Sequence, residues 1–159
     1  MRKTSQKGYL LDTTVFNDIL DDNLSADLFA NSLLFVTHIQ LDQIDRTSNE
    51  IRKNQLLRTF KMVSAEKLPT ASAVFDVSRW DEASWSDGVL FQAILDKLQA
   101  TDGKRKAKNY TGQLADGLIA ETAIRQNLTL VTNDQNLSKV TKEFGGEVVS
   151  LEQFVALRN

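Results

Sequence analysis

Two aspartates of this sequence closely follow apolar segments that are typical of buried strands. Asp12 comes directly after Tyr-Leu-Leu at positions 9–11, and Asp134 follows Leu-Thr-Leu-Val-Thr at positions 128–132. In an open parallel sheet, ligands bind outside the carboxyl ends of the strands, so the two carboxylates can meet in one cleft. The alternative is that each aspartate only caps the helix that follows it.

A third aspartate, Asp116, lies inside a segment with helical periodicity. Residues 111–126 carry an apolar stripe, and Ile119, Ala120 and Ala123 stand on the same side of the helix as Asp116. This spacing puts the carboxylate at or beside the apolar face. Because a buried, unpaired carboxylate is costly, Asp116 needs a cation, a hydrogen-bond network or a proton. The alternative is a border position with a partner inside the protein.

Three carboxylates in one site would repel one another and would favour a bound cation. Two unit charges about 4 Å apart interact by roughly 4 kcal/mol at an effective dielectric constant of about 20. The sequence has no cysteine and a single histidine, His38, which excludes a thiolate zinc site and disfavours imidazole-based catalysis. An all-oxygen site suits Mg²⁺ or Mn²⁺, and such ions serve in phosphodiester hydrolysis.

The elements that position these aspartates alternate between strand-like and helix-like segments. Apolar runs predict strands at residues 9–11, 33–36, 73–77, 128–132 and 147–149. Helices are expected over residues 15–20, 25–30, 37–60, 89–98, 111–126 and 133–144, and from residue 151 onward. This alternation favours an α/β fold with a parallel sheet. A length of 159 residues predicts one domain, spanning residues 1–159.

Composition and charge narrow the class of protein. Hydrophobic residues make up 42% and charged residues 25% of the chain, which is typical of a globular protein rather than a disordered one. A net charge of −2 excludes a strongly basic nucleic-acid binder. Because the sequence contains neither a long apolar run nor a secretory signal, we expect a cytoplasmic protein without a membrane anchor.

Four segments, in this order along the chain, resemble the acidic motifs of PIN-domain nucleases. Residues 9–15 resemble their opening strand and first acid, and residues 36–44 resemble the segment that holds their second acid. Residues 116–123 resemble the helix of the third acid, and residues 128–134 resemble the strand that ends in Thr-x-Asp. The likeness spans nearly the whole chain.

The resemblance implies a three-layer α/β/α fold with a central parallel sheet. It also implies an endoribonuclease that hydrolyses RNA with Mg²⁺ or Mn²⁺ and acts as the toxin of a type II toxin–antitoxin module. A small antitoxin is the expected partner, and many members of the family form homodimers. By the same resemblance, Asp12, Asp116 and Asp134 are metal ligands and catalytic groups, with Thr13 and Thr132 supporting them through hydrogen bonds.

Gln43 stands where the family usually has its second acid, a glutamate. A glutamine has nearly the same shape, but it cannot balance the charge of a metal or act as a base. Gln43 is therefore either natural, in a weak or redirected nuclease, or an engineered replacement of a glutamate. On a helical wheel Asp42 faces solvent, whereas Asp45 lies closer to the apolar side and is the better substitute acid.

A basic run precedes the helix of Asp116. Lys104, Arg105, Lys106 and Lys108 are expected to contact RNA phosphates, and such contacts are sensitive to salt. The alternatives are a solvated loop and a docking site for an acidic antitoxin tail. Asn109, next in the chain, either orients the site or caps the following helix.

Four further residues are expected to have ordinary structural roles. Glu121 is interpreted as a surface residue, and His38 as a capping or packing residue. Trp80 and Trp85 are expected to pack in the core, with base stacking or a protein interface as the alternatives.

Two rival functions remain at this stage. The first is a catalytically weakened PIN module that binds RNA or a protein, which Gln43 favours. The second is a phosphatase of the haloacid-dehalogenase type, whose signature needs two aspartates two positions apart. Here Thr14 stands where the second aspartate should be, which argues against this function.

Overall fold

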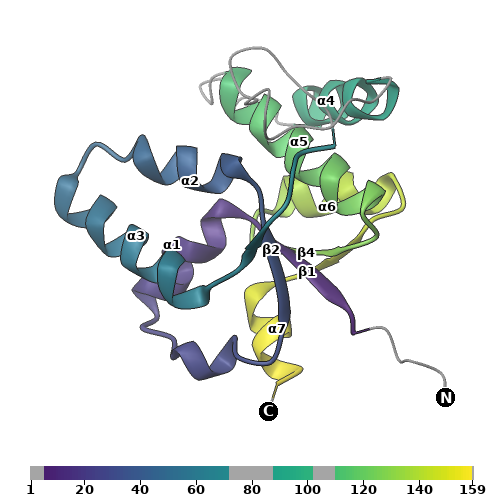
Figure 1. The fold of residues 1–159 in the computed structure, drawn as a ribbon. Coiled ribbons are helices and arrows are strands. Elements are labelled where there is room, and N and C mark those ends of the chain that lie inside the picture. The colour runs from purple at the N-terminus through teal and green to yellow at the C-terminus, as the bar shows by residue number, and fades with distance from the viewer. Residues whose placement is uncertain (1–5, 72–87, 102–109, 159) are drawn as a thin grey trace, which may run out of the picture.

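The computed structural model describes residues 6–71, 88–101 and 110–158, and a parallel five-stranded sheet lies at its centre (Figure 1). The strands are ordered β3-β2-β1-β4-β5, and each neighbouring pair is parallel. They span Gly8–Leu11 (β1), Leu33–Val36 (β2), Glu66–Lys67 (β3), Thr129–Val131 (β4) and Glu147–Val149 (β5). This confirms the α/β class. The strand expected at 73–77 lies outside the described residues.

Helices cover both faces of this sheet (Figure 1). They are Thr13–Asp21 (α1), a 3₁₀ turn Ala26–Leu28 (η1), His38–Asp45 (α2), Glu50–Val63 (α3), Val89–Thr101 (α4), Tyr110–Arg125 (α5), Gln135–Glu143 (α6) and Leu151–Ala156 (α7). Within the described ranges, none of the helices is long and apolar enough to cross a lipid bilayer.

The single helix expected over residues 37–60 is wrong, because the chain forms two helices there. Thr37 caps α2 as expected, but α2 ends at Asp45 and α3 begins at Glu50. Asn49 caps α3, since its side chain accepts a hydrogen bond from the Arg52 backbone N–H at 3.0 Å. Short polar residues such as those at positions 47–49 compete with helical hydrogen bonds and favour caps.

Successive side chains of β1 enter two separate cores. Leu10 belongs to the core formed with α4, α5 and α6, whereas Leu11 belongs to the core formed with α1, α3 and α7. This alternation follows from strand geometry, which sends successive side chains to opposite faces of the sheet. Both residues are fully buried. The result is the predicted arrangement of a parallel sheet between two helical layers.

The register of the sheet brings two distant segments to one level. Leu11 of β1 pairs with Val131 of β4, and the next backbone N–H of β1, that of Asp12, donates to the Val131 carbonyl at 3.0 Å. Thr132 likewise donates its backbone N–H to the Val149 carbonyl of β5 at 3.0 Å. Asp12 and Thr132 therefore leave adjacent strands side by side at the carboxyl edge of the sheet.

Candidate active site

Asp12 is held in place by three hydrogen-bond donors. Its Oδ1 accepts from the Thr13 backbone N–H at 2.7 Å, and its Oδ2 accepts from the hydroxyls of Thr14 and Thr132, each at 2.8 Å. The residue is only 3% exposed. Asp12 therefore caps α1 and also presents an oriented carboxylate at the sheet edge, so its two predicted roles coexist.

The surroundings of Asp12 act on its pKa in opposite directions. Burial raises the pKa of this carboxyl above its ordinary value, because a charged group is less stable away from water. The donors on Thr14, Thr132 and Thr13 lower the pKa, and the nearby charge of Asp134 raises it further. The net shift of the pKa is upward, which means that Asp12 carries its charge at a cost that a cation would offset.

Asp134 reaches the same edge through β4. Its backbone N–H donates to the Thr132 hydroxyl oxygen at 3.0 Å, while its Oδ1 caps α6 by accepting from the Leu137 N–H at 3.0 Å. The side chain is half-buried. The capping alternative is thus correct for Asp134, and its charge also acts on Asp12. Thr132 supports both aspartates through hydrogen bonds, as predicted.

Gln43 is connected to this site through Thr13. The Thr13 hydroxyl donates a hydrogen bond to Oε1 of Gln43, across the space between α1 and α2. The backbone N–H of the same threonine donates to Asp12. Gln43 is therefore connected to the Asp12 carboxylate through a single intervening residue, Thr13. The side chain at position 43 offers an oxygen there but no negative charge.

Gln40 is a residue of this region that sequence reasoning missed. It is fully buried, and its amide nitrogen donates to the Leu11 carbonyl at 2.7 Å. Its amide oxygen accepts from the backbone N–H and the hydroxyl of Thr37 at 2.8 and 2.7 Å. Gln40 thereby ties the end of β1 to the start of α2. The Thr-x-x-Gln capping-box pattern was the available signal.

The remaining predicted acids do not converge on Asp12. Asp116 is half-buried on α5, Asp45 is exposed at the end of α2, and Asp42, expected to face solvent, is half-buried. Across residues 6–71, 88–101 and 110–158, no three acidic or histidine side chains form a group that could hold a metal ion. The pair formed by Asp12 and Asp134 is what the described part of the chain brings together.

Several predicted residues lie outside the described residues. They are Asn109, the basic positions Lys104, Arg105, Lys106 and Lys108, and the tryptophans Trp80 and Trp85. Their predicted roles stay predictions.

Asn133 is a second residue that the sequence did not single out. Its amide nitrogen donates to Oδ2 of Asp18 on α1 at 2.6 Å, and its amide oxygen accepts from the Leu151 N–H of α7 at 3.0 Å. It lies between Thr132 and Asp134 in the chain. Asn133 therefore fixes the carboxyl end of β4 against two helices. No local sequence pattern predicts this role, because both partners, Asp18 and Leu151, are remote from Asn133 in the sequence.

The surface position predicted for Glu121 is wrong. Glu121 is fully buried on α5, and its two carboxylate oxygens accept no hydrogen bond from the described part of the chain. Its ionic neighbour is Arg125 one turn later, whose Nε lies 3.6 Å from Oε2. Glu121 is buried because packing encloses both sides of α5. His38 is also fully buried, as a packing role requires.

The carboxylate oxygens at this edge of the sheet are ligands of the type that a hard divalent cation prefers. Mg²⁺ binds through oxygen, commonly to one or two carboxylates while keeping several water ligands. Asp12 and Asp134 supply two carboxylates whose charges repel each other, and Asp12 lies in an environment that disfavours its charge. A cation would relieve both effects. Held by these two acids, it would take its other ligands mainly from water.

Comparison with known proteins gives likeness in fold but not in sequence. No family model and no curated protein matches the chain. The crystal structure of PAE2754 from Pyrobaculum aerophilum matches with a TM-score of 0.54 and 14% identity over 96% of both chains. A domain of a functionally unknown protein from Methanocaldococcus jannaschii matches with a TM-score of 0.52 and 12% identity over 91% of both chains.

A weaker likeness involves VapBC-5 from Mycobacterium tuberculosis, described as a member of the VapBC family of toxin–antitoxin systems. Its TM-score is 0.47, with 19% identity over 90% of this chain and 96% of the other. At such identities the likeness concerns the fold alone. The chain has the three-layer α/β/α fold around a parallel sheet that its resemblance to PIN-domain nucleases implied.

Proposed function

We propose that this chain is a metal-dependent endoribonuclease of the PIN type, acting in the cytoplasm as the toxin of a type II toxin–antitoxin module. The observation that carries the proposal is the buried Asp12 carboxylate, which is held by Thr132 and feels the charge of Asp134. The ordered resemblance of four sequence segments to PIN motifs supports the choice of substrate. A small antitoxin and a second copy of the chain are its proposed partners.

In this function Asp12 and Asp134 would hold Mg²⁺ or Mn²⁺, and water would supply most of the remaining ligands. A bound divalent ion supplies an activated water and neutralises charge on the phosphate. Thr14 and Thr132 keep the Asp12 carboxylate in one orientation, so little reorganisation is needed when charge develops. Gln43 can orient a water molecule through its amide but cannot accept its proton.

The test compares the chain as it stands with Gln43→Glu and Asp12→Asn variants on a mixed RNA pool. Each protein is incubated with millimolar Mg²⁺, with Mn²⁺ and with EDTA, and cleavage products are counted by sequencing their ends. We expect cleavage that needs the metal, is strongest in Gln43→Glu and is absent in Asp12→Asn. Cleavage that persists in EDTA or in Asp12→Asn would exclude this site as its source.

A second candidate function is a PIN module that binds RNA or protein without cutting. The replacement of the second acid by Gln43, whose Oε1 already accepts the Thr13 hydroxyl, favours it. The same assay separates the two functions. If no variant cuts RNA under any metal condition while the protein still retains RNA on a filter, the binding function is correct and the nuclease is not.

The toxin role has its own test, which is growth of a bacterial host under controlled expression. Gln43→Glu is expected to arrest growth, and Gln43→Glu combined with Asp12→Asn is expected to be harmless. Equal toxicity of both would show that arrest does not depend on the carboxylate site.

A further inference from the structure

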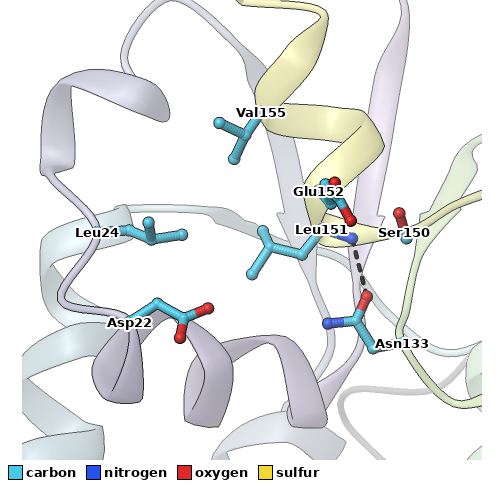
Figure 2. A pocket seen from close by; sticks show the side chains of 7 residues that line it. All are labelled: Asp22, Leu24, Asn133, Ser150, Leu151, Glu152 and Val155. Atoms are coloured by element: carbon cyan, nitrogen blue, oxygen red, sulfur yellow. Dashed lines mark hydrogen bonds between the residues drawn. The ribbon is translucent and has the colours of Figure 1, made fainter.

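A pocket lies between the end of α1 and α7, beside the candidate active site. Its volume is about 460 Å³, within the range of small-ligand pockets. Figure 2 shows Asp22 and Leu24 on one side, and Leu151, Glu152 and Val155 of α7 on the other. Asn133, which lies between Thr132 and Asp134 in the chain, also lines the pocket.

The floor of this pocket is apolar. Leu151 belongs to the core that α1, α3 and α7 share and is only 3% exposed, and Leu24 and Val155 pack against this core. Leu24 and Val155 are half-buried, so part of their surface faces the pocket. A ligand with methylene groups would remove this apolar surface from water, which favours binding.

The rim of the pocket is acidic and uncompensated. Asp22 and Glu152 are exposed, and neither carboxylate has an ion-pair partner among the described residues. The contrast with Asp21 is informative, because Asp21 is neutralised by Arg52 at 2.5 Å. Among the residues that the structure describes, no lysine or arginine lines the pocket. The rim therefore repels phosphate and attracts a cation.

We propose that this pocket binds a basic side chain, preferably arginine, from a protein partner. The methylene stem would lie on Leu24, Leu151 and Val155, while the guanidinium would stand between Asp22 and Glu152. Arginine suits such a place because its guanidinium is weakly hydrated and its stem is apolar. The same charges make this face unsuitable for an RNA backbone.

This inference rests on the proposed function in one respect, since it gives the chemistry of the antitoxin that the toxin role requires. The antitoxin would contribute an arginine beside an apolar residue. The position of Asn133 means that the bound segment would lie next to the strand end that carries Thr132 and Asp134. Binding and cleavage are nevertheless separate measurements.

The experiment titrates the full chain with the peptide acetyl-Leu-Arg-Leu-amide and follows methyl resonances by NMR. Acetyl-Leu-Gln-Leu-amide is the neutral probe. We expect the arginine peptide to shift the methyls of Leu24, Leu151 and Val155, and the glutamine peptide to bind more weakly. Asp22→Asn combined with Glu152→Gln should lower the affinity for the arginine peptide by roughly three- to tenfold, as expected for the loss of exposed ion pairs.

The matched control is Glu50→Gln, because Glu50 is also an exposed acid in the first turn of a helix, away from this pocket. It should leave peptide affinity unchanged. Equal affinity for both peptides, unchanged affinity in the double variant, or shifts of the same methyls by an oligouridylate would overturn the proposal. Shifts that appear on raising the protein concentration alone would assign the pocket to a second copy and overturn it too.

The two proposals fail separately. Peptide binding without RNA cleavage in any variant would contradict the nuclease function and leave the pocket assignment standing. RNA cleavage without peptide binding would contradict the pocket assignment alone.

Discussion

The Thr132 hydroxyl donates a hydrogen bond of 2.8 Å to Oδ2 of Asp12, although the two residues are 120 positions apart. The same oxygen accepts the Asp134 backbone N–H at 3.0 Å. One threonine therefore links the Asp12 carboxylate to the backbone of Asp134. The register of β1 against β4 produces this link, because Leu11 and Val131 pair and the next residues leave the sheet together.

Replacing Thr132 by valine should destabilise the protein, because valine keeps the shape and removes the hydroxyl. Asp12 would lose one donor, and the Asp134 N–H would lose its acceptor. We expect the free energy of unfolding to fall by about 1–3 kcal/mol, the usual cost of an unsatisfied buried polar group. Urea denaturation measures it, and Thr132→Ser is the control that keeps the hydroxyl. If the valine and serine variants were equally stable, the hydrogen bond would not contribute to stability.

The raised pKa of Asp12 predicts a particular pH dependence of stability. Burial makes the folded protein hold this proton more tightly than the unfolded chain, whose aspartates have a pKa of about 3.9. Between the pKa of Asp12 in the unfolded chain and its higher pKa in the folded protein, the folded state binds more protons than the unfolded state. The contribution of Asp12 to stability therefore falls as pH rises through this window, and the loss persists at higher pH.

The Asp12→Asn variant lacks this titrating group, so its stability can be compared with that of the unmodified chain at each pH. In EDTA, its unfolding free energy relative to the unmodified chain should increase as the pH rises from about 4 to 8. Urea midpoints across that range measure the difference. Parallel pH profiles for the two proteins would mean that Asp12 titrates alike in the folded and unfolded states.

Gln40 should matter more for stability than its neighbour Gln43. Gln40→Leu leaves the Leu11 carbonyl and the Thr37 backbone N–H without their partners in a buried place. We expect a loss of about 2–4 kcal/mol in the unfolding free energy, from two unsatisfied buried groups. Gln43→Leu is the matched control on the same helix, because Gln43 is half-buried and accepts one hydroxyl. Similar losses in the two variants would contradict the role assigned to Gln40.

The fold was largely predictable because its signals are local. The apolar runs before Asp12 and Asp134 mark β1 and β4, and alternation of strands with helices indicates a parallel sheet. Cap residues such as Thr37 are equally local, and Thr37 caps α2 as expected. The break between α2 and α3 was missed because the apolar stripe has the same periodicity on both sides of the break. The polar residues at positions 47–49 nevertheless end one helix and start the next.

The site was predictable only in part, because its contacts join remote segments. That Asp12 and Asp134 would lie at the same edge of the sheet followed from the rule for parallel sheets. The partners of Asn133 on α1 and α7 could not be read from any spacing, since they depend on how these helices pack. The burial of Glu121 likewise depends on neighbours on both sides of α5. Packing between layers is a property of the whole fold and leaves little trace in a short sequence window.

The last prediction concerns Gln43 and the stabilising effect of a divalent cation. A glutamate at this position can accept the same Thr13 hydroxyl and adds a negative charge to a region that already contains Asp12 and Asp134. Without metal, Gln43→Glu should therefore be less stable than the chain as it stands, since like charges repel. With Mg²⁺ or Mn²⁺ the order should reverse.

The reason is that the cation binds the native state and gains a further ligand from the new carboxylate. A cation at about ten times its dissociation constant adds about 1.4 kcal/mol to stability, which corresponds to a rise of roughly 3–6 °C in the melting temperature for a domain of this size. Calorimetry in EDTA and in millimolar Mn²⁺ gives the melting temperature of each protein without and with the cation. Asp45→Asn is the control, because Asp45 is exposed at the end of α2 and its charge should not affect the cation response. If the cation raised the melting temperatures of the unmodified chain and of the Gln43→Glu variant equally, position 43 would lie outside the metal's reach, and the nuclease proposal would have to rest on Asp12 and Asp134 alone.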